Sequence, residues 1–539
     1  MSTNVGRLRV RVLCVLFVLV LGAPVFSSMW NSENSIEHFL MVVGSTNGPI
    51  TIMQPSSWYM LIDEPGYYRL DEDIINCTAE CCIYITASDV VLDGAGHLVD
   101  SGGSASYGVY VYNATNVVIK NLRLSDWSEY GVYASFSNNT QIDSNTIWNC
   151  TYGIYLTDSD NCEISNNIIE NSSWCGIHIN AAWYPEVNNN TVKGSYYIGI
   201  SVEFSRWCEI ANNTIISNEN GLYIHYCTGA KIHSNIILDN YGEGLHLDNS
   251  DECSIYNNTI ERNSNVGLWV DDSANNEISW NVIRQNDKGI WLYFSERNRL
   301  YCNTIENNTF CGLELYNSQN DEIFANNIID NFEQYEISES SSTLYSSEPI
   351  MYSYRGQIYT NHTGNYWSDY NGTDTNGDGI GETPYGPDKY PLVGIVGEEI
   401  KILIDRTPPV IEIISPSNNS ILNTTRVTIV WRGSDDLSGI DHYEIYVDDV
   451  LVNDSIPAGQ NNYTLTLGEG KHTIEIKAID KAGNEAICRV VITIRTSTTT
   501  GTTKPAEEEE RGIPPYAIVV VIVLAMAITA TVLLKRTKS

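Results

Sequence analysis

Residues 199–222 read GISVEFSRWCEIANNTIISNENGL, and this pattern recurs from residue 108 to residue 315. Glycines mark it at intervals of 22 or 23 residues: Gly108, Gly131, Gly153, Gly176, Gly199, Gly221, Gly244, Gly267, Gly289 and Gly312. The first and third residues after each glycine are aliphatic or alanine, as at Ile200 and Val202. Such alternation is typical of a strand with one buried face. A repeat of this length indicates stacked structural units.

A second mark follows each of these strands: aliphatic residues flank an asparagine, as at Ile210, Asn213 and Ile215. Each unit therefore supplies three short strands separated by Gly, Asn, Ser and Asp corners. Stacking places identical positions about 4.8 Å apart, with aliphatics inside and asparagine amides in ladders at the bends. The sequence predicts an all-β fold, a right-handed single-stranded parallel β-helix, because such crossovers are right-handed. A leucine-rich repeat has a similar period but usually needs helical return segments.

Three further stretches carry a family resemblance: DVVLDGAGH at residues 89–97, GNYWSDY at 364–370 and DTNGDGIG at 374–381. With the repeat, they resemble the NosD-like β-helix family, part of a wider group of carbohydrate-binding proteins and sugar hydrolases. The last two blocks look like the end of the β-helix in many archaeal surface proteins. The resemblance spans residues 60–395 and implies the fold. Because the family name comes from a copper-maturation protein, it also implies copper handling as an alternative function.

Both ends of the chain carry targeting signals. Basic residues, then an apolar run, then small residues give residues 1–28 the order of a secretory signal peptide. Residues 516–534 are almost wholly apolar and long enough for a C-terminal transmembrane helix. The basic residues within 535–539 predict a cytoplasmic tail. We therefore expect a single-pass cell-membrane protein with the bulk of the chain extracellular.

Between these two signals, the sequence pattern divides the chain into a β-helix with its caps, a second domain and a linker. Alternating strands with turn residues between them predict an immunoglobulin- or fibronectin-like β-sandwich over residues 408–495. A Thr- and Glu-rich linker at 496–515 joins it to the membrane helix. The β-helix is expected over 66–339, with an N-terminal cap at 29–65 and a C-terminal cap at 340–397. Caps are expected because terminal rungs expose unpaired strand edges.

The composition is strongly acidic, with a formal net charge of −36 over 539 residues. This charge argues against nucleic acid as a partner, because phosphate binding requires the opposite sign. Asn-x-Ser/Thr sequons predict a glycoprotein, although the repeat itself favours Asn and Thr. They include Asn76, Asn113, Asn149, Asn361, Asn371, Asn423 and Asn462.

The second residue after each glycine points to the outer face of its strand, and most of these residues are aromatic. The column consists of Tyr110, Tyr133, Tyr155, His178, Ser201, Tyr223, His246, Trp269, Trp291 and Glu314. We predict that Tyr223, His246, Trp269 and Trp291 bind substrate, because aromatic faces in a row suit sugar rings. The alternative is structural, since aromatic residues favour strands and pair across them.

Two residues further along the same strand, Glu203, His225, Asp248 and Asp271 occupy consecutive units. Stacked carboxylates repel one another, which raises at least one pKa or attracts a cation or a protonated His225. We predict that Glu203, Asp248 and Asp271 are catalytic and that His225 contacts substrate. Carboxylates one or two rungs apart match the spacings of glycoside hydrolysis. The alternative is an acidic protein that places acids on a solvent-facing surface.

A loop near the end of the β-helix is a candidate metal site. Asp374, Asn376 and Asp378 match the first half of an EF-type calcium loop, but Tyr385 stands where the bidentate glutamate belongs. An atypical calcium site and a plain Asx-rich turn both remain open. Copper is the less favoured metal, because no tight cluster of Cys, His and Met occurs.

These features support three hypotheses. The first is a surface-anchored β-helix protein that binds polysaccharide or glycan and can process it as a hydrolase or lyase. The second is a non-catalytic adhesin or a structural rod of the cell envelope. The third is a NosD-like copper-binding protein.

Overall fold

The computed structural model describes residues 50–52, 59–403, 405 and 407–496. The chain forms two compact units, Met1–Leu403 and Ile404–Ser539. The predicted signal peptide, transmembrane helix and tail, and nearly all of the linker, lie outside the described residues. Within the described part of the chain, no helix has the length and apolar character needed to cross a membrane.

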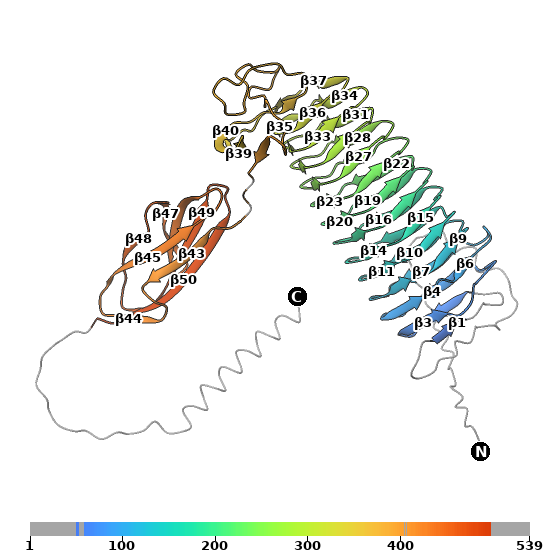
Figure 1. Ribbon diagram of the computed structural model, residues 1–539. Coiled ribbons are helices and arrows are strands. Elements are labelled where there is room, and N and C mark those ends of the chain that lie inside the picture. Colours follow the sequence, from blue (N-terminus) through green and yellow to red (C-terminus); the bar gives the residue numbers. More distant parts are fainter. Residues whose placement is uncertain (1–49, 53–58, 404, 406, 497–539) are drawn as a thin grey trace, which may run out of the picture. The chain divides into compact units, whose positions relative to one another are not determined.

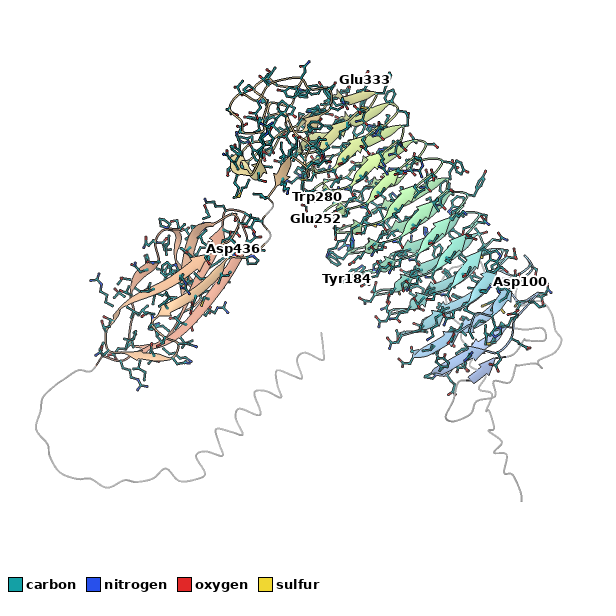
Figure 2. All side chains as sticks on the ribbon, viewed as in Figure 1. Asp100, Tyr184, Glu252, Trp280, Glu333 and Asp436 are labelled. Carbon is teal, nitrogen blue, oxygen red and sulfur yellow. The ribbon has the colours of Figure 1, made fainter. Side chains whose placement is uncertain are left out.

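The first unit is a right-handed parallel β-solenoid of about 12 turns, as the sequence predicts (Figure 1). Its turns build three parallel sheets, here called A, B and C, with 14, 13 and 12 strands. One turn, for example, contains β19 (Ile198–Glu203) in sheet B, β20 (Glu209–Ala211) in sheet A and β21 (Thr214–Ile216) in sheet C. Side chains project outward all around the rungs (Figure 2).

Sheet B contains the glycine-led strands. In spatial order its strands are β2 (Met60–Ile62), β4 (Cys81–Ile85), β7 (Tyr107–Tyr112), β10 (Tyr130–Ser135), β13 (Tyr152–Thr157), β16 (Cys175–Asn180), β19, β22 (Asn220–His225), β25 (Leu245–Asp248), β28 (Val266–Asp271), β31 (Lys288–Tyr293), β34 (Cys311–Tyr316) and β37 (Glu333–Ser338). The glycine is required by close packing between rungs. A Cβ on Gly221 would lie 2.4 Å from the carbonyl oxygen of Gly244 and 2.7 Å from Cγ2 of Ile237.

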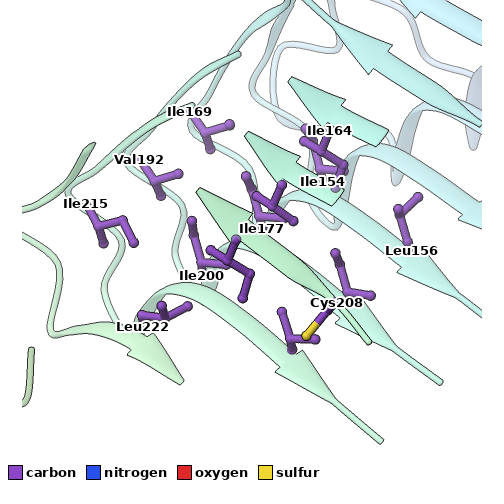
Figure 3. Close-up of a cluster of buried hydrophobic side chains, with 14 of the residues drawn as sticks. Ile154, Leu156, Ile164, Ile169, Ile177, Val192, Ile200, Cys208, Ile215 and Leu222 are labelled. Atoms are coloured by element: carbon purple, nitrogen blue, oxygen red, sulfur yellow. The ribbon is translucent and has the colours of Figure 1, made fainter. Parts of the chain in front are cut away.

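The register predicted from alternation is confirmed. Leu222 and Leu268 are buried, whereas Tyr223 and Trp269 lie on the outer face. Figure 3 shows the aliphatic side chains of successive rungs gathered in the interior. Full burial of each such side chain stabilises the fold by about 1.5–3 kcal/mol.

Asparagine ladders hold the corners, as predicted. The longest runs from Asn145 to Asn365, with each Nδ2 donating to the next Oδ1 at 2.9–3.1 Å. Its members are Asn145, Asn167, Asn190, Asn213, Asn235, Asn258, Asn281, Asn303, Asn326 and Asn365. The same amides also donate to backbone carbonyls, such as that of Ile210. These buried polar groups are therefore satisfied.

Solenoid pairing extends beyond the predicted limits of 66 and 339. At the N-terminal end, β1 (Ile50–Ile52) pairs with β3 (Gly66–Leu70), and β2 pairs with β4. At the C-terminal end, β38 (Ser341–Thr343) and β41 (Tyr366–Trp367) extend sheets A and C. Parts of both predicted caps therefore continue the stack.

The rest of the C-terminal segment covers the last rungs. Strands β39 (Ile350–Tyr354), β40 (Gln357–Asn361) and β42 (Ile400–Ile402) form an antiparallel sheet. Its side chains share an apolar cluster with the solenoid residues Tyr301 and Phe324. The solenoid core is a separate cluster that includes Leu344 and Trp367, and the rings of Tyr335 and Tyr385 pack against Trp367.

The second unit has two sheets packed around one core, as expected of a sandwich. Its strands are β43 (Val410–Ser415), β45 (Arg426–Ser434) and β48 (Asn462–Thr466) in one sheet, and β44 (Ser420–Leu422), β50 (Glu485–Ile494), β49 (Gly470–Asp480), β46 (Ile440–Val447) and β47 (Val450–Pro457) in the other. Trp431 is fully buried within this core.

Candidate functional site

The predicted aromatic column exists on sheet B, where Ser201 interrupts it, and its rings are stacked from His246 to Trp291. Parallel pairing places Tyr223 beside His246, His246 beside Trp269, and Trp269 beside Trp291. The rings of His246 and Trp269 lie 4.0 Å apart at an angle of 4°, and those of Trp269 and Trp291 lie 4.9 Å apart at 17°. The strand spacing of about 4.8 Å is close to a ring-stacking distance, which explains the stack.

The stacking differs from the prediction of open aromatic faces. His246 and Trp291 cover both faces of Trp269, and the ammonium of Lys288 lies 4.1 Å from the centre of the Trp291 ring. The indole nitrogens of both tryptophans are buried without a hydrogen-bond partner. A sugar can therefore meet only ring edges in this part of the column.

The predicted carboxylates share one column. Glu203 pairs in register with His225, His225 with Asp248, and Asp248 with Asp271. These four side chains are 17% to 24% exposed, so they are sheltered but reachable. The structure thus aligns the three residues predicted for catalysis in one column, with Asp248 and Asp271 on adjacent strands and Glu203 two strands from Asp248.

Hydrogen bonds fix the central carboxylate, Asp248. The hydroxyl of Tyr223 donates to its Oδ2 at 2.7 Å, and Nδ2 of Asn249 donates to its Oδ1 at 2.7 Å. Nε2 of His225 lies 3.4 Å from the same Oδ2. At one end of the column, the Ser201 hydroxyl donates to Glu203 at 2.9 Å.

The electrostatics differ along the column. Burial, together with the charges of Asp248 and Asp272, raises the pKa of Asp271 to about 6. Burial lowers the pKa of His246 to about 4, so this ring is neutral at pH 7. The prediction that one carboxyl has a raised pKa is confirmed. A carboxyl that keeps its proton up to about pH 6, one rung from a second carboxylate, has the properties of an acid/base pair.

Several contacts were not predicted from the sequence. Asn249 and Ser201 orient the carboxylates, and the rings of Phe204 and Tyr226 lie 5.7 and 4.3 Å from that of His225. A signal for the two aromatic residues exists, since each directly follows a member of the carboxylate column.

The loop of Asp374, Asn376 and Asp378 forms a turn whose carboxylates accept backbone hydrogen bonds. Asp374 accepts from the amides of Gly377 and Gly379 at 2.7 and 3.0 Å. Asp378 accepts from the amide of Ile380 at 2.9 Å. These bonds are those of the Asx-rich turn that the sequence left open. Calcium binding at this loop stays a prediction.

A second acidic cluster lies in the sandwich unit. One carboxylate oxygen from each of Asp405, Asp435 and Asp480 lies within 4.8 Å of the others. Backbone amides satisfy these groups: Ser438 donates to Asp405, Gly439 to Asp435 and Ala482 to Asp480. Hydrogen bonds from Ser438 and Thr407 hold the pKa of Asp405 below its usual range. The cluster stabilises the loops between strands.

The described residues do not fit a copper site. Among them, the only group of three His, Cys, Asp or Glu side chains with converging ligand atoms is the all-aspartate cluster in the sandwich unit. Copper favours imidazole and sulfur ligands. His225 has one carboxylate within reach, and desolvation raises the pKa of buried thiols such as Cys175, so that loss of the proton that metal binding requires is unfavourable there. Hydrogen bonds with Cys82 and Cys208 lower the pKa of Cys77 and Cys227, but neither thiol belongs to a group of three converging ligands among the described residues.

The fold and the site define a parallel β-solenoid joined to an immunoglobulin-like domain. The family model described as periplasmic copper-binding protein (NosD) matches residues 88–266 and 257–372, more than half of the chain. The chain therefore belongs to the NosD family. A bacterial Ig domain model matches residues 409–476 in the second unit. No curated protein matches this sequence.

Solved structures with similar solenoids include three carbohydrate-active enzymes. The mannuronan C-5 epimerase AlgE4 A-module of Azotobacter vinelandii has 15% identity and a TM-score of 0.40, covering 52% of this chain and 91% of that one. The periplasmic alginate epimerase AlgG has 17% identity and a TM-score of 0.33, covering 52% and 76%. DFA-IIIase of Arthrobacter chlorophenolicus A6 has 11% identity and a TM-score of 0.35, covering 47% and 82%. At these values none of the three activities transfers to this chain.

Proposed function

We propose that the solenoid binds a neutral polysaccharide on the outer face of sheet B and hydrolyses its glycosidic bonds with Asp271 and Asp248. The observation that carries this proposal is the raised pKa of Asp271, about 6, one rung from Asp248. A protonated carboxyl beside a second carboxylate is the pair that glycoside hydrolysis requires.

The charge of the site favours a neutral substrate. Glu203, Asp248 and Asp271 concentrate negative charge on one face of a chain whose net charge is −36. Lys288, the nearby cation on β31, is already paired with Glu314 at 2.7 Å. A uronate lyase must neutralise the carboxylate of its substrate, and this surface repels that group. Hydrolysis of a neutral glycan is therefore favoured over lyase chemistry.

The register suggests the roles of the two residues. Adjacent strands are about 4.8 Å apart, close to the carboxyl separation of about 5–5.5 Å in retaining enzymes. Asp271 gives its proton to the glycosidic oxygen as the bond to the leaving sugar breaks, while Asp248 bonds to the anomeric carbon. Water then attacks that carbon, gives its proton to Asp271 and releases Asp248. Tyr223 and Asn249 hold Asp248 for the attack.

A screen of neutral polysaccharides for new reducing ends tests this proposal. Wild type should release product, whereas Asp248→Asn and Asp271→Asn should not. Glu252→Gln, a change at an exposed corner of the same solenoid, is the matched control. If wild type cleaves no polysaccharide in the screen, hydrolysis is excluded for those substrates.

We further propose that the protein is exported and held at the cell membrane by residues 516–534, with the solenoid outside. Support comes from the signal and anchor patterns of the sequence. Protease digestion of intact cells should remove the solenoid, and a chain truncated after residue 515 should appear in the medium. Retention of the truncated chain in cells would contradict the anchor.

A non-catalytic rod is the second candidate. The uninterrupted asparagine ladder and core are suited to a stiff spacer. Under this alternative, polysaccharide binding without cleavage is expected, and Asp271→Asn leaves binding unchanged.

A further inference from the structure

A group of exposed aromatic side chains lies at the corner between sheets B and A. This corner patch consists of Trp183, Tyr184, Phe204, Arg206, Trp207 and Tyr226. Each of its five rings is 44% to 52% exposed. Figure 2 shows Tyr184 at the outer edge of the rungs. The patch thus offers the open aromatic surface that the stack on sheet B lacks.

The backbone at this corner does not favour large rings. Tyr184 and Trp207 have φ values of 55° and 53°, in the left-handed region. Asparagine occupies the equivalent position in five other rungs, and Gly229, Glu252 and Arg297 occupy it in three: the asparagines are Asn116, Asn139, Asn161, Asn275 and Asn320. Left-handed geometry is unfavourable for bulky residues and tolerated by asparagine. Aromatic residues held there at a conformational cost indicate a function rather than a folding requirement.

The rings form an ordered platform. Tyr184 and Trp207 are stacked 5.0 Å apart at 15°, and Trp183 meets Trp207 edge-on at 5.9 Å. The next rung carries Gly229, where a Cβ would lie 2.7 Å from Cδ1 of Trp207. The indole of Trp207 therefore packs directly against this glycine, in the space that a side chain at residue 229 would occupy.

The corner patch is continuous with the carboxylate column. Phe204 and Tyr226 stack 5.3 Å apart, and both contact the ring of His225. His225 in turn lies 3.4 Å from Asp248. A ligand on the patch can therefore extend directly onto the site on sheet B.

The charge beside the patch selects against polyanions. Glu163, Glu186 and Glu209 lie in register on successive strands of sheet A, two residues past this corner, and Lys231 continues the row on the next strand. Burial and the charges of its two neighbours raise the pKa of Glu186. Such a row repels uronate or sulfated chains, while its oxygens can accept hydrogen bonds from sugar hydroxyls.

We propose that the corner patch binds the sugar rings of a neutral polysaccharide, and that one chain spans this patch and the carboxylate column. Flat aromatic rings match the apolar faces of pyranoses. The inference rests on the proposed function, because it supplies the binding surface for the same substrate. This inference also sets the direction of the bound polysaccharide, which runs from sheet B across the corner rather than along the solenoid axis.

The test compares Tyr184→Asn and Trp207→Asn with wild type. Asparagine suits the left-handed backbone, so these changes should keep or raise the melting temperature while removing the rings. Calorimetric titration with soluble xylan, mixed-linkage β-glucan and starch should show binding of at least one probe. Each variant should weaken it about tenfold. Tyr196→Asn removes a ring that is 81% exposed elsewhere on the solenoid and should leave binding unchanged.

The outcomes separate this inference from the proposed function. If both variants bind and cleave like wild type, the corner patch is not the binding surface and the proposed hydrolysis still stands. If no neutral probe binds to or is cleaved by wild type, both proposals fail. Preferential binding of alginate, a polyanion, would refute the inference that the patch binds a neutral polysaccharide. A wild-type dimer in sedimentation that dissociates in both variants would show that a second copy occupies the patch instead.

Discussion

The early and late rungs of the solenoid share one frame but present different chemistry. On the outer face of sheet B, the column that holds Glu203, His225, Asp248 and Asp271 in the late rungs contains Ser135, Thr157 and Asn180 in the early ones. The neighbouring column begins with three tyrosines whose adjacent rings are tilted by 46° and 52°. Backbone pairing is the same in both regions, so the difference comes from side chains alone. The repeat therefore creates equivalent outward-facing positions in every rung, and only a few rungs place titratable side chains there.

The largest expected effect is a loss of hydrolytic activity that occurs on substitution in the late rungs and not in the early ones. Asp271→Asn should lower the rate of polysaccharide hydrolysis by about 10²–10⁴-fold, because the general acid is lost. Thr157→Ala, at the equivalent position of an early rung, should leave the rate unchanged. The measurement is reducing-end release at fixed substrate concentration. Equal rates for the two variants would remove the distinction between early and late rungs.

The backbone stacking that both regions share should be destabilised to a similar degree when a repeat glycine is replaced by alanine in either region. A Cβ on Gly131 would lie 2.5 Å from Cγ2 of Ile147, and one on Gly221 would lie 2.4 Å from the carbonyl oxygen of Gly244. We expect Gly131→Ala and Gly221→Ala each to lower the free energy of unfolding by about 1–3 kcal/mol through overpacking. Thermal unfolding followed by circular dichroism checks this. A large loss at one site only would show that the rungs are not equivalent.

A pH dependence of stability is expected from Asp271 in the late rungs. Because the folded pKa of Asp271, about 6, is above its unfolded value, the native state binds more protons between about pH 4 and 6. Stability should therefore fall as pH rises through this window, and Asp271→Asn should make that fall smaller, because Asp321 and Asp388, whose pKa values burial also raises to about 6, still contribute. Hydrolysis should also decline above about pH 6 as the acid loses its proton. Melting temperatures of the two proteins from pH 4 to 8 test the sign, and a parallel course would contradict it.

The smallest expected effect concerns the loop at residues 374–381. Asp374→Ala should lower the free energy of unfolding by about 1 kcal/mol, because its carboxylate accepts backbone hydrogen bonds in the turn. Melting in EDTA and in calcium distinguishes the alternatives. The same loss in both buffers supports the turn, whereas a wild-type midpoint that rises only with calcium supports the predicted metal site.

The positions that the repeat fixes could be predicted from the sequence, whereas the exposure of each side chain could not, because it depends on residues in adjacent rungs. The column of Glu203, Asp248 and Asp271 follows from a constant period, because parallel stacking aligns equivalent positions. The open face expected for Trp269 did not follow, since His246 and Trp291 cover it. The cluster of Asp405, Asp435 and Asp480 was also missed, because its members are far apart in sequence.

The sequence by itself determined the all-β repeat, the inward register of residues such as Leu222, and the shared column of carboxylates. These are consequences of period and alternation, which are local properties of a strand. Only the tertiary structure decided how exposed each ring is, which carboxyl keeps its proton, and that Tyr184 and Trp207 meet at one corner. Burial and contact depend on the rungs above and below. The physical reason is that desolvation and ring packing are set by neighbours in space rather than by neighbours in the chain.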